Sequence, residues 1–224
     1  MHLLAIETAT DVCSIALAEE NRLMAESTIH APRKHSELLA ALISQQSENL
    51  GYDLDQLDGV AVSIGPGSFT GLRIGLSTAK GLLFSSDGAL LAVPTLLASA
   101  WSVRDVADEV AVLHHSHRDT CFLAAYELNE SPTEIIEPVR DSIDVLKTQL
   151  PEDMPVVYQA PNEEKLQSEL PNPIIGRNRV NARNIAEVAL SDMDRWAVED
   201  PNIAEPDYLK EYEAVKFSNP LHSD

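Results

Sequence analysis

SIGPGSFTGLRIG, residues 63–75, holds four glycines, one proline and three hydroxyl side chains. It follows the apolar run 60–64, which predicts a buried strand, and it precedes apolar positions at helical spacing over residues 72–85. A glycine turn between a strand and a helix is a common setting for anion binding, because the first helical amides point outward. The segment therefore predicts an α/β fold and raises the question of a phosphate site.

The spacing of the glycines matches neither standard nucleotide loop. A phosphate-binding loop of the G-x4-G-K-[ST] type needs glycine five residues after Gly65, where Thr70 stands, and a dinucleotide loop needs glycine at the same position. Two interpretations stay open. Gly65 and Gly67 could permit a tight turn with Ser68 or Thr70 capping a closely packed helix, or the turn could contact phosphate.

Strands and helices follow on both sides of this segment in the order β-β-β-α-β-α-β-α. The predicted strands are 3–7, 12–18, 22–29, 60–64 and 89–93, and the predicted helices are 34–50, 72–85 and 95–103. Short polar joints between the first three strands predict an antiparallel start. This order is typical of a ribonuclease-H-like lobe, a mixed sheet flanked by helices.

The second half of the chain repeats this order of strands and helices less completely. Strands are expected at 110–115, 120–126, 135–139 and 155–160, and helices at 141–150, from Asn162, and at 181–192. We predict a first lobe over residues 1–104, a smaller second lobe over 105–200, and a tail over 201–224 that packs back on the first lobe.

Acidic side chains outnumber basic ones by 36 to 16, which gives a net charge of −20. Such a surface repels nucleic acid, so either the acidity serves solubility or a basic partner mediates any contact with RNA. Cys13 and Cys121 lie apart in apolar runs and are expected to be buried free thiols. No leader or membrane-spanning segment is expected, and we predict a cytoplasmic protein.

Several polar residues are candidates for chemistry. His114, His115 and His117 could hold a metal, but three histidines at the end of a hairpin are more simply exposed. Glu7 could bind a metal or polarise water, or it could serve the turn that follows it. Ser68 lies in G-P-G-S-F, which does not match the nucleophile elbow of hydrolases. We therefore predict no catalytic residue and no metal site.

Five motifs together resemble the TsaB (YeaZ) family: LAIETAT at 4–10, PRKHSE at 32–37, GPGSFTGLRIG at 65–75, VPTL at 93–96 and PDYLK at 206–210. The resemblance implies two ribonuclease-H-like lobes of the actin and sugar-kinase superfamily. It also implies a non-catalytic scaffold or activating subunit of the machinery that places threonylcarbamoyl on the adenosine next to the anticodon of tRNA.

The resemblance further implies the partners of the chain. It would dock on a TsaD-like catalytic paralogue, with a TsaE-like ATPase joining and a TsaC-like enzyme linked functionally. Alone it would form a homodimer, it would meet tRNA only through the complex, and it would meet no membrane. Part of the apolar stripe on two helices must cover the sheet. The resemblance implies that the same helices also form the interface, through Leu38, Leu39, Leu42, Ile43, Leu72, Leu76, Ala79 and Leu83.

Residues at specific positions separate an accessory chain from a catalytic one. TsaD-like proteins carry H-x-x-x-H where this chain has Thr95 and Ser99, and superfamily members carry glycine where it has Ala9. We expect no cofactor of its own, with an ATP or ADP contact at the shared interface left open. The residues for that contact are Gly65, Gly67, Ser68, Thr70, Gly71 and Arg73. The alternatives are an independent nucleotide-dependent enzyme, kinase-like or ATPase-like, or a peptidase-like protein.

Overall fold

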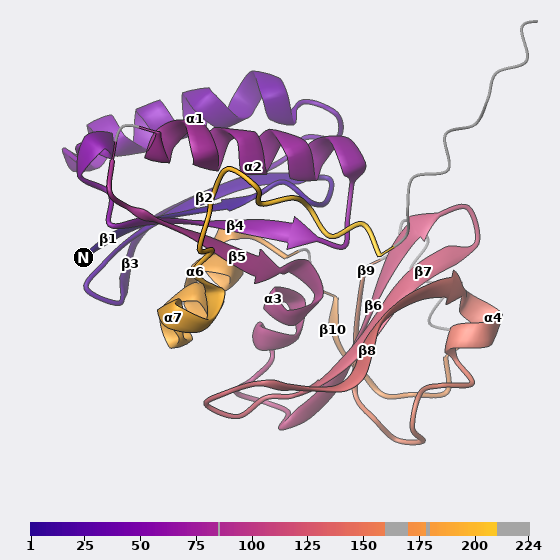
Figure 1. The fold of residues 1–224 in the computed structure, drawn as a ribbon. Coiled ribbons are helices and arrows are strands. Elements are labelled where there is room, and N and C mark those ends of the chain that lie inside the picture. Colours follow the sequence, from indigo (N-terminus) through magenta and orange to yellow (C-terminus); the bar gives the residue numbers. More distant parts are fainter. Residues whose placement is uncertain (85, 160–169, 178–179, 210–224) are drawn as a thin grey trace, which may run out of the picture.

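The computed structural model describes residues 1–84, 86–159, 170–177 and 180–209. Two five-stranded sheets form the two lobes (Figure 1). In the first sheet the order is β3-β2-β1-β4-β5, with β1 antiparallel to β2 and parallel to β4. Its strands are β1 (His2–Glu7), β2 (Val12–Glu19), β3 (Arg22–His30), β4 (Gly59–Gly65) and β5 (Ala89–Pro94).

Helices cover both faces of the first sheet. On one face lie α1 (His35–Leu50) and α2 (Phe69–Leu83), with the short turn η1 (Leu54–Gln56) between them in sequence, and on the other lie α6 (Ala182–Ser191) and α7 (Met193–Trp196) (Figure 1). β1 shows why both faces need cover: Leu3 and Ala5 point into one core, and Leu4 and Ile6 point into the other. A strand that is apolar at successive positions is stable only when it is buried on both sides.

The second sheet has the order β10-β9-β6-β7-β8 and is also mixed. Its strands are β6 (Glu109–His117), β7 (Thr120–Glu127), β8 (Thr133–Ser142), β9 (Val156–Gln159) and β10 (Ile174–Arg177), and α4 (Ile143–Leu146) follows β8. The short helix α3 (Thr95–Trp101) joins the lobes, and all seven of its residues are buried. Two mixed sheets flanked by helices confirm the predicted fold class.

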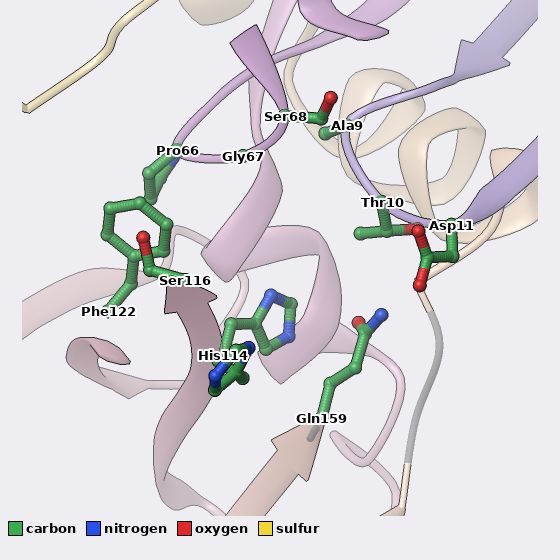
Figure 2. Close-up of a pocket in the computed structure, with 11 residues that line it drawn as sticks. Ala9, Thr10, Asp11, Pro66, Gly67, Ser68, His114, Ser116, Phe122 and Gln159 are labelled. Carbon is green, nitrogen blue, oxygen red and sulfur yellow. The ribbon is translucent and has the colours of Figure 1, made fainter. Parts of the chain in front are cut away.

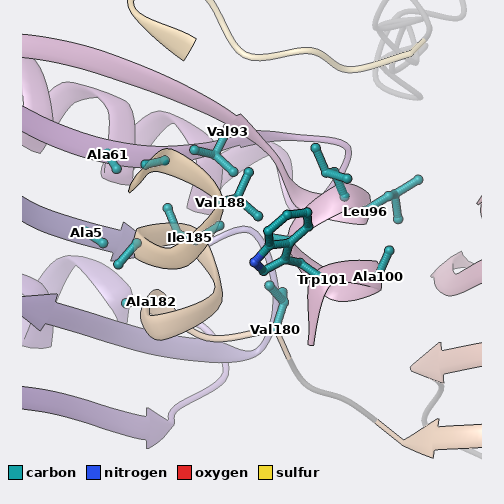
Figure 3. Close-up of a cluster of buried hydrophobic side chains, with 14 of the residues drawn as sticks. Ala5, Ala61, Val93, Leu96, Ala100, Trp101, Val180, Ala182, Ile185 and Val188 are labelled. Carbon is teal, nitrogen blue, oxygen red and sulfur yellow. The ribbon is translucent and has the colours of Figure 1, made fainter. Parts of the chain in front are cut away.

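The central core lies between the two sheets, around α3 and α6 (Figure 3). Trp101 from α3 packs there among Leu96, Val180 and Val188. Removing apolar side chains of this size from water is the main favourable term in folding, about 1.5–3 kcal/mol for each large one. This shared core, drawn from both halves of the chain, therefore holds the lobes together.

The second half differs from the expectation at the helix after β8 and at β10, a strand that was not predicted. The helix expected over 141–150 is helical only from Ile143 to Leu146, and the helix expected from Asn162 lies outside the described residues. The last predicted helix exists as α6, but Ala182, Ile185 and Ala189 belong to the core shared with the first sheet. The division of the chain at residues 104 and 200 itself stays a prediction.

Residues 201–209 run along α2, in the yellow part of the chain (Figure 1). Lys80 Nζ donates to the carbonyl oxygens of Asn202 and Ala204 at 3.0 and 2.9 Å. Asp207 N–H donates to the Ile64 carbonyl at 2.7 Å, beside the glycine turn. Within the part of the chain that the structure describes, no helix combines the length and apolar character needed to cross a bilayer.

Candidate functional site

The glycine segment fits closely against the turn that follows β1. A Cβ on Gly71 would lie 2.0 Å from the carbonyl oxygen of Thr8, and one on Gly67 would lie 2.5 Å from the carbonyl oxygen of Ala9. Gly65 has a φ of 126°, which other residues rarely adopt, whereas Gly67 does not have a positive φ. Gly67 and Gly71 are therefore required for close approach of two backbones.

Two N–H groups around the start of α2 are already engaged. Ser68 N–H donates to the Ala9 carbonyl at 2.7 Å, and Gly71 N–H donates to the Ser68 hydroxyl at 3.2 Å. Ser68 is thus the helix cap, one of the two residues predicted for that role. Thr70 and Arg73 are exposed on the first turns of the helix. The contacts favour the close-packing interpretation, because these amides are not available to a phosphate.

Arg73 contacts two aromatic side chains that pack against each other. Its Cζ lies 3.9 Å from the centroid of the Phe69 ring, and its Nε donates to the Tyr208 hydroxyl at 3.0 Å. The Phe69 and Tyr208 rings are themselves 4.8 Å apart. The arginine at the candidate nucleotide motif therefore fastens the C-terminal segment to α2, a role the sequence analysis missed.

Thr95 and Ser99, one turn apart on α3, also have internal partners. The Thr95 hydroxyl accepts a hydrogen bond from Gly65 N–H at 3.2 Å, and the Ser99 hydroxyl lies 2.9 Å from His114 Nε2. All three side chains are buried. Burial lowers the pKa of the His114 imidazole to about 4, so the ring is neutral at pH 7. The expectation that the histidines of this cluster are exposed is wrong for His114, because α3 covers the end of β6.

Ser99→Ala should destabilise the protein by about 1–3 kcal/mol, because His114 Nε2 would stay buried without a partner. The exposed Ser77→Ala on α2 serves as the control and should change the unfolding free energy by less than about 0.5 kcal/mol. A cycle with His114→Leu, measured by urea denaturation, should give a coupling of about 1 kcal/mol. Additive losses would show that the two side chains do not interact.

Glu7 ends β1 inside the first lobe and is fully buried. Its Oε1 accepts from Ala9 N–H at 2.7 Å, which is the turn-forming role considered above. Burial raises the pKa of its carboxyl to about 8, and the Ser63 side chain and the turn that follows β1 act in the opposite direction. Glu7 is therefore mostly protonated at pH 7 and is a poor metal ligand or base.

A cleft of about 240 Å³ lies between the lobes. Three turns or strand ends surround it: residues 9–11 after β1, residues 66–68 before α2, and residues 114–116 at the end of β6 (Figure 2). Phe122 from β7 and Gln159 from β9 complete the lining. Some of these residues are candidates from the sequence, but no sequence pattern places them together, because they come from five separate segments.

Most of the residues predicted to form the partner interface are buried inside the chain. Leu38 is half-buried at the edge of the core under α1 and α2. The other seven are fully inside the protein: Leu39, Leu42, Ile43, Leu72, Leu76, Ala79 and Leu83. Their apolar stripe covers the first sheet, so those seven are not on the surface. A partner that docks on these helices would meet other side chains, such as Ala41 on α1 and Ser77 on α2, which are exposed.

The remaining candidates are isolated from one another. Cys13 and Cys121 are both buried and form no disulfide with each other, as predicted. His115 is half-buried with Nε2 2.8 Å from the Arg118 carbonyl oxygen, and His117 is exposed. Among the described residues, no group of three or more His, Cys, Asp or Glu side chains could hold a metal ion.

Known proteins resemble this chain over most of its length. The family model described as "TsaD: tRNA N6-adenosine threonylcarbamoyltransferase" matches residues 25–204. A structure from Pseudomonas aeruginosa, titled as an uncharacterized protein with similarity to peptidase YEAZ, superimposes with a TM-score of 0.79. That match has 22% identity and covers 93% of this chain and 99% of the other, so it shows the same fold.

Two curated relatives carry the name tRNA threonylcarbamoyladenosine biosynthesis protein TsaB. The Escherichia coli protein is 31% identical over 58% of this chain and 57% of its own length. The Haemophilus influenzae protein is 37% identical over 44% of this chain and 41% of its own length. The chain thus spans about half the length of these relatives. Because the family model matches well over half of the chain, the protein belongs to the TsaD family that this model describes, and two of its relatives bear the name TsaB.

Proposed function

We propose that the protein is a non-catalytic subunit of the machinery that installs threonylcarbamoyl on the adenosine next to the anticodon of tRNA. It would act by docking on a TsaD-like paralogue that carries the catalytic site. Its family membership and the names of its TsaB relatives support a place in this modification. The proposal includes a TsaE-like ATPase in the complex and a functional link to a TsaC-like enzyme.

The proposal of a non-catalytic role rests on one observation, which is that Thr95 and Ser99 are buried and already hydrogen-bonded within the chain. The resemblance implies histidine ligands at these positions in TsaD-like proteins. Here both side chains are hydroxyls that are buried and already bonded, to Gly65 and to His114. A hydroxyl engaged in this way supplies neither the nitrogen ligand nor the open coordination position that a catalytic metal needs.

The exposed faces of α1 and α2 support docking of another helix pair. Ala40, Ala41 and Ser44 on α1 and Ser77 and Gly81 on α2 are exposed and small, which lets a partner helix approach closely. We propose that a second copy uses this face when the chain is alone. With a net charge of −20, the chain would meet tRNA only through a basic partner. An ATP or ADP contact at the shared interface is part of the same proposal.

Reconstitution tests this role directly. Purified TsaD-like, TsaE-like and TsaC-like proteins, with ATP, threonine, bicarbonate and unmodified tRNA, should form threonylcarbamoyladenosine only when this chain is added. The chain alone should form none. Ala41→Arg with Ser77→Arg should reduce co-purification with the TsaD-like partner, whereas the exposed Gln149→Arg in the second lobe should not. Equal modification without the chain would overturn the proposal.

The same preparation tests the alternatives. Release of phosphate from ATP by the chain alone would favour an independent nucleotide-dependent enzyme, and peptide cleavage with stoichiometric zinc would favour a peptidase. Either activity, lost on substitution of this chain's own residues, would contradict the accessory role.

A further inference from the structure

Residues 202–209 form a strap that holds both charged side chains of α2 (Figure 1). Arg73 and Lys80 are the two charged residues among the 15 of this helix. Lys80 Nζ donates to two backbone carbonyls of the strap, at 3.0 and 2.9 Å. Arg73 Nε donates to the hydroxyl of Tyr208 in the strap, at 3.0 Å. The strap therefore supplies an acceptor to each cation of α2.

The strap also fits against the glycine turn that precedes α2. Asp207 N–H donates to the Ile64 carbonyl at 2.7 Å. A Cβ on Gly65 would lie 2.1 Å from the carbonyl oxygen of Asp207, so a side chain at position 65 would push the strap away. The glycine segment at 65–75 and the strap are far apart in sequence, yet they form one joint in the fold.

The two cations lie beside the face of α2 that the proposed function uses for docking. Arg73, Ser77 and Gly81 follow one another at spacings of four residues along the exposed side of the helix. A Cβ on Gly81 would meet nothing within 4 Å, so a partner helix can come close there. A long cationic side chain lying across this row would hold the partner away and would lose its water when covered. The positions of Arg73 and Lys80 therefore decide whether the face is clear.

The strap is held less firmly than the core beneath it. Its hydrogen bond from Arg73 and one of its two bonds from Lys80 are exposed. Ile203 is 75% exposed, and Ala204 and Leu209 are only partly buried where they meet the core. Segments with few buried apolar contacts and exposed hydrogen bonds open at a lower free energy than the core. The strap can thus detach while the rest of the chain stays folded.

We propose that the strap controls docking at α2. In its closed position it holds Arg73 and Lys80 and leaves Ser77 and Gly81 clear for a partner helix. In its open position it releases both cations onto this face, and the partner binds weakly. The inference rests on the proposed function for the identity of the partner, a TsaD-like paralogue, but opening of the strap is measurable on the chain alone.

Asp207→Pro combined with Tyr208→Ala should open the strap, because one change removes the N–H that Ile64 binds and the other removes the acceptor of Arg73. The NMR signal of the Arg73 Nε–H group should shift in this open-strap variant. Ile203→Ala combined with Glu205→Ala, two exposed positions in the same strap, should leave that signal unchanged. In the unmodified chain, hydrogen exchange at Asp207 N–H should be at least about tenfold faster than at the amides of β4. Equal exchange rates would contradict a strap that opens separately.

Calorimetry with the purified TsaD-like partner measures docking. The open-strap variant should bind at least about tenfold more weakly than the unmodified chain, and the Ile203 and Glu205 control should bind equally well. Adding Arg73→Ala and Lys80→Ala to the open-strap variant should restore binding to within about threefold, since no cation is then released. Full binding by the open-strap variant, or failure of this restoration, would overturn the control of docking by the strap. Absence of binding by the unmodified chain would instead overturn the proposed function.

Tyr208→Phe provides a milder test that keeps the ring of residue 208 against Phe69. It removes only the hydroxyl that Arg73 binds, so it should weaken docking less than the double substitution, and Arg73→Ala should cancel the loss. Circular dichroism and thermal unfolding verify that each variant folds. This comparison remains decisive if the open-strap variant does not fold, and unchanged docking by Tyr208→Phe together with an unshifted Arg73 signal would contradict the assigned hydrogen bond.

Discussion

Gly71→Ala should destabilise the protein by about 3 kcal/mol, although alanine is the better helix former. The new Cβ would lie 2.0 Å from the Thr8 carbonyl oxygen, which is backbone and cannot rotate away. The Thr8 hydroxyl also donates to the Gly71 carbonyl at 2.8 Å, so the turn after β1 cannot shift without losing this bond. Urea denaturation followed by circular dichroism measures the loss.

Gly81→Ala is the matched control for this substitution. Gly81 lies on the same helix, but a Cβ there would meet nothing within 4 Å. The change should therefore stabilise the protein by up to about 1 kcal/mol, since alanine restricts the unfolded chain and favours the helix. Effects of the same sign at both positions would contradict the close packing of the glycine segment.

Glu7→Gln should make the protein more stable at pH 8 by up to about 4 kcal/mol. The folded protein binds a proton at Glu7 until the pH approaches 8, whereas the carboxyl in the unfolded chain loses its proton near 4.5. Between these values the native state holds more protons, so the contribution of Glu7 to stability falls as the pH rises. Glutamine is neutral throughout, and its oxygen can still accept from Ala9 N–H.

The difference between Glu7→Gln and the unmodified protein isolates this one group from the other carboxylates. Unfolding free energies measured from pH 4.5 to 8.5 should converge at the acid end and diverge steadily toward the basic end. Glu137→Gln, an exposed position on β8, removes the same charge and should show no such divergence. A constant difference across the range would mean that Glu7 is ionised in the folded protein.

Local sequence patterns were sufficient for the first lobe. Apolar runs such as 60–64 predict strands buried on both faces, and the spacing of Leu39, Leu42 and Ile43 predicts the buried stripe of α1. The spacing of apolar residues does not show which surface the apolar face of a helix packs against. The same leucines were expected both to cover the sheet and to form a partner interface, and the structure shows them buried against the chain's own sheet.

Contacts between distant segments limited the prediction elsewhere. Ile185 and Ala189 mark an apolar face on α6, but nothing near them in sequence shows that it packs on the first sheet. His114 looked exposed because hairpin ends usually are, and only α3 explains its burial. Gln159 is one polar residue after an apolar run, and only the folded structure shows that it lines the cleft.

The position of α6 has a consequence for how the chain folds during synthesis. The first sheet needs α6 on one face, yet residues 182–191 leave the ribosome long after β1 to β5. Until then Leu3, Ala5 and Ala16 would remain open to water, a state prone to aggregation. The native first sheet is therefore secured only after residues 182–191 have been synthesised, although all five of its strands lie before residue 95.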